Sequence, residues 1–170
     1  IQAALTGHLV LSTLHTNDAP AAITRMLDLG APAYLLNATL LGIMAQRLVR
    51  VLCPHCKAAH PPTPEEEAIW DHLVAPWKVA RPPRIHRAVG CMECRMTGFM
   101  GRIGLYEILL MSPEIRKVVS VDLDLARVRD LAIREGMRPL RLSGAAKVAA
   151  GITTLEEVVK VAPPADDEGH

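Results

Sequence analysis

The sequence predicts an α/β protein with an inserted four-cysteine metal module and a helical C-terminal region. Three features carry this prediction: a short apolar run followed by helical patterns, two close pairs of cysteines, and a series of short amphipathic segments after residue 111. Half of the 170 residues are apolar, which is enough for a packed core, and only 3% are aromatic. We therefore expect a core built from Leu, Val, Ile, Ala and Met.

The overall composition excludes several classes of partner. The formal net charge is +1, so there is no electrostatic case for nucleic acid or for an acidic membrane surface. No apolar stretch reaches the roughly 18 residues that span a bilayer, and we expect no signal peptide. The chain begins with Ile1, and its first residues, IQAAL, resemble the middle of a helix, so we expect a fragment of a longer protein.

Residues 1–52 are predicted to contain one strand and two helices. A short apolar run over residues 9–13 is typical of a buried strand. Asp18 or its neighbour Asn17 can cap the next helix, Pro20 suits the first turn of that helix, and a glycine at position 30 ends it.

The second helix is predicted over residues 33–49 and is apolar nearly all round, so we expect it to be buried. Its polar exceptions Thr39, Gln46 and Arg50 would share one face, with Arg47 beside them. One strand does not make a sheet, so this region is predicted to be part of a larger layered α/β domain.

Composition changes at Cys53, where a segment rich in Pro, His and Cys begins, and residues 53–111 are predicted to form a separate module. Thr63 and Glu66 form the capping-box pattern that starts a short helix. A strand candidate follows at residues 103–110, after several glycines.

Residues 112–161 are predicted to be a run of short helices. One of them ends at Gly151, and Thr154 with Glu157 opens the last. Residues 162–170 are predicted to be a frayed tail.

All four cysteines lie in two pairs with the two-residue gap that lets both sulfurs reach one ion: Cys53 with Cys56, and Cys91 with Cys94. Four thiolates favour a structural Zn²⁺ site. The spacer of 34 residues between the pairs exceeds that of a usual zinc ribbon, which indicates an inserted helix. Iron in the same four-thiolate set, two disulfides or redox dithiols are the alternatives.

Histidines flank the predicted N-terminal strand. His8 and His15 would lie roughly 20 Å apart, too far to act on one atom. Ligands bind at the carboxyl ends of strands in open α/β sheets, which favours Thr13 and His15 as groups that hydrogen-bond a phosphate. Alternatively, His15 satisfies backbone groups at the helix cap. No GxxxxGK[ST] loop occurs in the sequence, so these residues cannot form a complete nucleotide site.

Four stretches of the sequence resemble, in the same order, the ATPases that drive type II secretion and type IV pilus assembly. The first, AALTGHLVLSTLHTNDA, is similar to the histidine box of that family. The others are AQRLVRVLCPHCK, GCMECRMTGFMGRIGLYEIL and GMRPLRLSGAAKVAAGITTLEEVVKV. The resemblance covers residues 1–161, although Ser143 stands where family members often have Asp.

This resemblance implies a hexameric RecA-like P-loop ATPase of the cytoplasm that docks on the inner membrane through platform proteins. It implies that ATP hydrolysis with Mg²⁺ drives pilin or pseudopilin assembly and protein export. Residues 1–52 would belong to the back half of the RecA-like core, followed by a zinc module inserted after the histidine box. The phosphate-binding loop, the acidic box and the Mg²⁺-binding carboxylates would precede Ile1, so the chain alone is predicted to be inactive.

The resemblance also implies roles for individual residues. His15 is the stronger candidate for a γ-phosphate sensor and His8 the weaker one. Arg47 and Arg50 are candidates for contacts between subunits, with a helix-dipole or surface role as the alternative. The residues alone also leave open a stand-alone zinc-ribbon adaptor that binds a protein, or an iron–thiolate electron carrier.

Overall fold

The computed structural model describes residues 1–162, and the chain falls into two compact units. Unit 1 contains residues 1–45 and 107–139. Unit 2 contains residues 46–106 and the chain from residue 140 onward. Each unit therefore joins segments that are far apart in the sequence.

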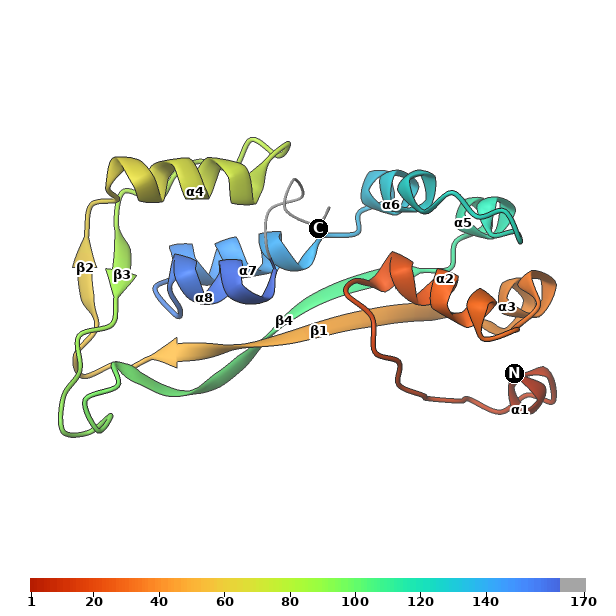
Figure 1. Cartoon of the computed structure of the whole chain (residues 1–170), viewed down its shortest axis with the longest axis horizontal. Coiled ribbons are helices and arrows are strands. Elements are labelled where there is room, and N and C mark those ends of the chain that lie inside the picture. Colours follow the sequence, from red (N-terminus) through yellow and green to blue (C-terminus); the bar gives the residue numbers. More distant parts are fainter. Residues whose placement is uncertain (163–170) are drawn as a thin grey trace. The chain divides into compact units, whose positions relative to one another are not determined.

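Unit 1 is mainly helical. Its helices are α1 (Gln2–Leu5), α2 (Ala19–Asp28), α3 (Ala33–Thr39), α5 (Pro113–Val118) and α6 (Leu125–Arg134). Helix α6 packs against both α2 and α5 (Figure 1). The fully buried side chains here are aliphatic, among them Ile23, Leu36 and Ile115, as the composition predicts.

Unit 2 combines three helices with a short two-stranded ladder. The helices are α4 (Pro64–Val74), α7 (Leu140–Ala149) and α8 (Leu155–Val161), and they pack against one another (Figure 1). Strands β2 (Ala58–His60) and β3 (Ile85–Arg87) pair antiparallel, with Ala59 opposite His86. Trp70 on α4 is the only aromatic side chain of the described residues that is buried.

Local capping signals correctly predict where several helices begin. Asp18 caps α2, because its side chain accepts a hydrogen bond from the backbone N–H of Ala21 at 2.8 Å. Thr63 and Glu66 form both bonds of the predicted capping box on α4. Thr154 accepts from the backbone N–H of Glu157 at the start of α8.

The predicted second helix is wrong over its C-terminal half. Helix α3 ends at Thr39, and β1 (Gly42–Leu52) follows, paired with β4 (Phe99–Leu110). Along β1, exposed residues such as Gln46 and Leu48 alternate with buried ones such as Ala45 and Val49. The predicted shared polar face is therefore also wrong, because Thr39 lies on a different element, and in a strand Arg47 and Arg50 point to opposite faces.

The predicted buried strand at residues 9–13 is also absent from the described structure. These residues have no regular secondary structure, and Leu11 is 89% exposed. A strand needs a neighbour for its backbone N–H and C=O groups, and no described strand pairs with this segment. By contrast, the strand predicted at residues 103–110 is confirmed as part of β4, which begins earlier, at Phe99.

Most of the predicted tail, residues 163–170, lies outside the described residues. Within the described part of the chain, no helix combines the length and the apolar character needed to cross a membrane.

Candidate metal centre

The four cysteine sulfurs come together in unit 2, all within 4.8 Å of one another. Cys53 and Cys56 follow β1, whereas Cys91 and Cys94 lie between β3 and β4. The β2–β3 ladder closes the intervening insertion, which contains α4, and so brings its two ends together. The long spacer is therefore compatible with a single site.

The distances between sulfurs fit a tetrahedral metal ion. The Cys53–Cys91, Cys56–Cys94 and Cys91–Cys94 sulfur pairs are separated by 3.9, 3.8 and 3.8 Å. A tetrahedron with metal–sulfur bonds near 2.3 Å has edges of about 3.8 Å. All four are free thiols, which rules out the disulfide alternative in this structure. The four cysteines therefore fit a single metal ion bound by four thiolates.

Backbone N–H groups are directed at two of the sulfurs. Cys94 Sγ accepts from the N–H groups of Cys91 and Gly98 at 3.2 and 3.1 Å, and Cys56 Sγ accepts from Gly90 at 3.2 Å. Both glycines have positive φ, and a Cβ at Gly98 would lie 2.5 Å from that of Ala88. Glycine at these two positions thus allows the backbone to approach the sulfurs, and such bonds stabilise thiolates.

The pKa values of these two cysteines are shifted in opposite directions. Burial acts to raise the pKa of Cys94, but the N–H groups of Cys91 and Gly98 and the neighbouring thiols lower it to about 6. For Cys56, burial raises the pKa to about 11, against the effect of the Gly90 N–H group. Because metal ligation requires thiolates, binding of a divalent cation would release protons from this cluster.

Nearby histidines contribute no atom to the cluster. The only group of described residues positioned to hold a metal ion consists of the four cysteines. His60 Nδ1 lies 2.9 Å from the carbonyl oxygen of Pro61, and His86 packs against Gly151. Burial, followed by Lys57, Arg84 and His60, lowers the pKa of His86, which favours its neutral form.

The histidine-flanked segment lies in unit 1 and is not close-packed. His8 Nδ1 lies 3.1 Å from Thr6 Oγ1 and 3.2 Å from the carbonyl oxygen of Ala3. Thr13 and His15 are exposed, and the helix-capping role considered for His15 is filled by Asp18. The structure therefore does not place His8, Thr13 or His15 in a common site.

A buried polar network at the start of α2 was missed by sequence reasoning. The buried Glu107 on β4 accepts a hydrogen bond from the backbone N–H of Ala19 at 2.8 Å, and Asp18 forms an ion pair with Arg129 on α6. This network fixes the helix that follows the histidine-flanked segment. The local sequence indicated only that Asp18 caps α2. The contacts of Glu107 with Ala19 and of Asp18 with Arg129 join residues that are about 90 or more positions apart.

Arg50 has specific partners within unit 2. Its guanidinium lies 4.0 Å from the ring centroid of Phe99 and 2.6 Å from Glu157 Oε1. The backbone N–H of Arg50 also donates to Glu157 Oε2, at 3.2 Å. Arg47 donates to the carbonyl oxygen of Gln46 at 3.0 Å. Arg50 therefore joins the end of β1 to α8.

We expect Glu157→Gln to destabilise unit 2 by about 2 kcal/mol at pH 7. The side chain of Glu157 is only 9% exposed, and its hydrogen bond to the Arg50 side chain, opposed by burial, lowers the pKa from 4.5 to about 2. A depressed carboxyl pKa adds stability above pH 4.5, and this contribution disappears as the pH falls towards 2. Urea unfolding at pH 7 and pH 3 measures the difference from wild type.

The matched control is Glu156→Gln, which removes an exposed carboxylate one residue away. We expect it to change stability by less than about 0.5 kcal/mol at either pH. A Glu157→Gln variant as stable as wild type at pH 7, or a difference that persists unchanged at pH 3, would contradict this assignment.

Comparison with known proteins identifies the family. A family model described as "Type II/IV secretion system protein" matches residues 1–160. The type IV pilus assembly ATPase TfpB of Acinetobacter baylyi is 50% identical over 163 residues, 96% of this chain and 27% of TfpB. The type II secretion system protein E of Pseudomonas aeruginosa is 45% identical over 161 residues, 95% of this chain and 31% of that protein.

A relative from a third organism is also similar. The type IV pilus assembly ATPase PilB of Thermus thermophilus is 42% identical over 158 residues, which cover 93% of this chain and 17% of PilB. The chain thus spans less than a third of the length of these relatives. With a family match over nearly its whole length, the chain belongs to the type II/IV secretion system protein family.

Proposed function

We propose that these residues are the C-terminal portion of a hexameric ATPase that couples ATP hydrolysis to pilin or pseudopilin assembly and protein export. The observation that carries the proposal is the 50% identity to a pilus assembly ATPase over 96% of this chain. Both pilus assembly and type II secretion proteins occur among the relatives, so the proposal covers the two pathways together.

In this proposal, residues 1–52 belong to a RecA-like core, residues 53–111 form the metal module, and residues 112–161 form a C-terminal helical region. Zn²⁺ is the proposed ion, held by Cys53, Cys56, Cys91 and Cys94. The sulfur separations of 3.8–3.9 Å support this choice. The ion would cross-link the two ends of the insertion, and the protein supplies all four ligands, so the role is structural.

The 170 residues do not fit a nucleotide on their own, because the sequence contains no GxxxxGK[ST] loop. We therefore propose that the phosphate-binding loop and the Mg²⁺ ligands belong to the rest of the complete protein, and that this chain alone neither binds ATP tightly nor hydrolyses it. His15 is the proposed phosphate-sensing group, with Thr13 and His8 as weaker candidates. The exposure of all three is consistent with contact to residues outside this chain.

The proposed partners are other copies of the protein and inner-membrane platform proteins, with no nucleic acid and no direct membrane span. Arg47 and Arg50 stay candidates for contacts between subunits; the Arg50 side chain is 45% exposed despite its ion pair. The proposed location is the cytoplasm, at the periphery of the inner membrane.

The first test is to sequence the coding DNA upstream of the Ile1 codon. We expect a GxxxxGK[ST] loop and an acidic box in frame within roughly 150 residues, about one domain length. The complete protein should then hydrolyse ATP and show the mass of six subunits by light scattering. A start codon immediately before Ile1, or a complete protein without ATP hydrolysis, would favour the zinc-ribbon adaptor instead.

A further inference from the structure

The first turn of α2 is held by side chains from two other elements of unit 1. Glu107 on β4 is 4% exposed, and its Oε1 accepts the backbone N–H of Ala19 at 2.8 Å. Asp18 Oδ1 accepts the N–H of Ala21 at 2.8 Å, and Asp18 Oδ2 forms an ion pair with Arg129 on α6. The start of α2 is therefore fixed both to β4 and to the neighbouring helix α6.

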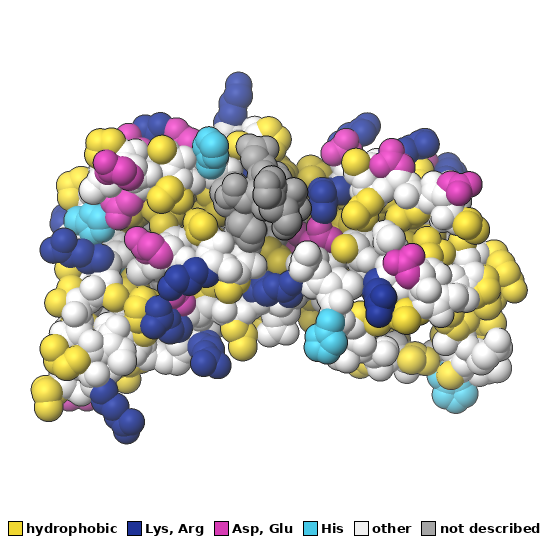
Figure 2. Space-filling model, in the orientation of Figure 1, with side chains coloured by type: hydrophobic (Ala, Val, Ile, Leu, Met, Phe, Trp, Pro, Cys, Tyr) yellow, Lys and Arg dark blue, Asp and Glu magenta, His cyan; other side chains and the backbone are white. Residues whose placement is uncertain are grey.

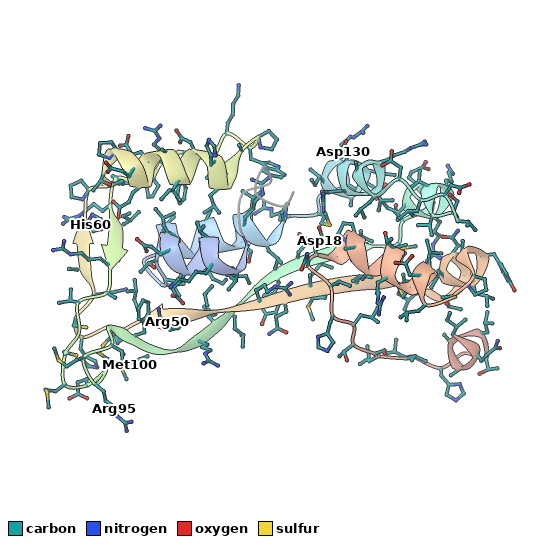
Figure 3. All side chains as sticks on the ribbon, viewed as in Figure 1. Asp18, Arg50, His60, Arg95, Met100 and Asp130 are labelled. Carbon is teal, nitrogen blue, oxygen red and sulfur yellow. The ribbon has the colours of Figure 1, made fainter. Side chains whose placement is uncertain are left out.

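Arg129 is the charged partner of Asp18. The side chain of Asp18 is only 12% exposed, so water does little to stabilise its carboxylate. Burial of a carboxylate is unfavourable unless the group is paired, and removal of one partner leaves the other charge uncompensated. Figure 3 labels Asp18 at the start of α2 and Asp130, the residue after Arg129, on α6. We therefore expect the position of the Asp18 side chain to depend on Arg129.

His15 lies three residues before this anchored position. Residues 9–15 have no regular secondary structure, and His15 is exposed. Figure 2 shows histidine side chains (cyan) at the surface of unit 1. Thr16 Oγ1 donates to the Asp18 carbonyl at 3.1 Å, which restrains the turn between the two positions. Because three residues span at most about 11 Å, the anchored Asp18 limits the region in which His15 can lie.

We propose that Arg129 is a positioning residue for ATP hydrolysis, which acts through Asp18 to hold His15 where its imidazole contacts the phosphate. This inference rests on the proposed function, which assigns phosphate sensing to His15. Arg129 touches no nucleotide in this scheme, because its ion-pair partner is the side chain that caps α2. A displacement of about 1 Å in a group that contacts a reacting centre can reduce the rate on the order of 10²-fold.

A purely structural role for the ion pair makes a different prediction. Loss of Arg129 would then destabilise unit 1 and reduce turnover by the same factor whether or not His15 is present. Positioning predicts instead that the effect of Arg129 depends on His15, because each substitution removes the same contact to the phosphate. A double-mutant cycle distinguishes the two roles.

The cycle is measured in the complete protein. We expect Arg129→Gln to reduce kcat for ATP about tenfold or more, with KM within about twofold, because the contact strengthens as charge develops on the phosphate. In the His15→Ala background, Arg129→Gln should change kcat by less than about twofold. Arg129→Lys keeps the positive charge and should recover part of the loss. The control is Arg127→Gln, which removes an exposed arginine from the same helix and should leave turnover unchanged.

A second variant guards against misfolding of Arg129→Gln. Asp18→Asn keeps an oxygen that caps α2 but removes the negative charge of the ion pair. It should lower kcat as Arg129→Gln does, and with the same dependence on His15. Hydrogen exchange reports the anchoring directly: residues 15–21 should exchange faster in both variants, whereas α5 should exchange as in the wild type.

Three results would each overturn the proposal: wild-type kcat for Arg129→Gln, an equal reduction in both backgrounds of the cycle, or unchanged exchange of residues 15–21. Absence of ATP hydrolysis in the wild-type complete protein would refute the proposed function and, with it, a role in turnover. Exchange of residues 15–21 would then show separately whether Arg129 anchors this segment.

Discussion

Cys94→Ser is expected to abolish metal binding and to unfold the segment between the cysteine pairs. Cys94 accepts two of the three backbone N–H bonds to the sulfurs, so the substitution removes a thiolate ligand and replaces the acceptor of those two bonds by a smaller, neutral hydroxyl. Metal binding supplies on the order of 10 kcal/mol to small modules of this kind. This is the largest effect on stability that we expect from a single substitution in the chain.

The measurements are zinc content by mass spectrometry and hydrogen exchange of residues 53–98, with chelation of the wild type as a parallel route to the same state. Met92→Ser is the matched control, because it introduces the same side chain two residues away at a position that is not a ligand. The control should retain the metal. Protection from exchange that survives both Cys94→Ser and chelation would show that the ion does not stabilise the module. Visible absorption by the purified protein would identify iron instead of zinc.

His15→Ala in the complete protein is expected to reduce ATP turnover by about 10²–10³-fold, the usual effect of removing one donor to developing negative charge. His15 is exposed, and Asp18 caps α2, so the substitution should leave helix α2 intact. The metal content should be unchanged, because His15 belongs to unit 1 and the cysteines to unit 2.

Turnover, the KM for ATP and zinc content are compared with those of His8→Ala and His72→Ala. His72 is an exposed histidine on α4, far in sequence from the proposed phosphate contact, and its loss should not change turnover. His8→Ala should have the weaker effect of the two flanking histidines. Wild-type turnover by His15→Ala would refute the sensor role.

Sequence alone predicted features that depend on neighbouring residues. The starts of α2, α4 and α8 depend on side chains within three residues of each helix start, so a short stretch of sequence is enough to predict these caps. The cysteine pairs are equally local, and their assembly into one cluster followed from the chemistry of the ligands.

The features that were missed depend on distant partners. Residues 42–49 are apolar enough for a buried helix, and their β conformation requires β4, which begins more than 45 residues later. The alternation of Gln46 and Leu48 with Ala45 and Val49 was the available signal. Residues 9–13 show the opposite error, because their composition predicts a strand but the described chain offers them no partner.

Distance also explains the missed polar contacts. Glu157 was recognised only as the third residue of a helix, yet its carboxylate accepts from Arg50, 107 positions earlier. The local sequence does not show which residue Glu107 contacts, although Glu107 is buried and accepts a hydrogen bond from the first N–H of α2. A charged residue inside an apolar strand pattern, as in GLYEILL, was the clue that a specific partner had to exist.

The discontinuity of unit 2 has a consequence for protein synthesis. Its first segment ends at Tyr106. However, Leu52 donates its N–H to the Ile152 carbonyl, and Arg50 donates to the carboxylate of Glu157, so both contacts need residues that are synthesised later. At roughly 5–20 residues per second, the ribosome releases α8 several seconds after the last cysteine. During that interval the cysteines can take up metal while Leu73 on α4 lacks the cover of α7 and α8. A nascent chain stalled before residue 140 would therefore be a substrate for chaperones even with its metal in place.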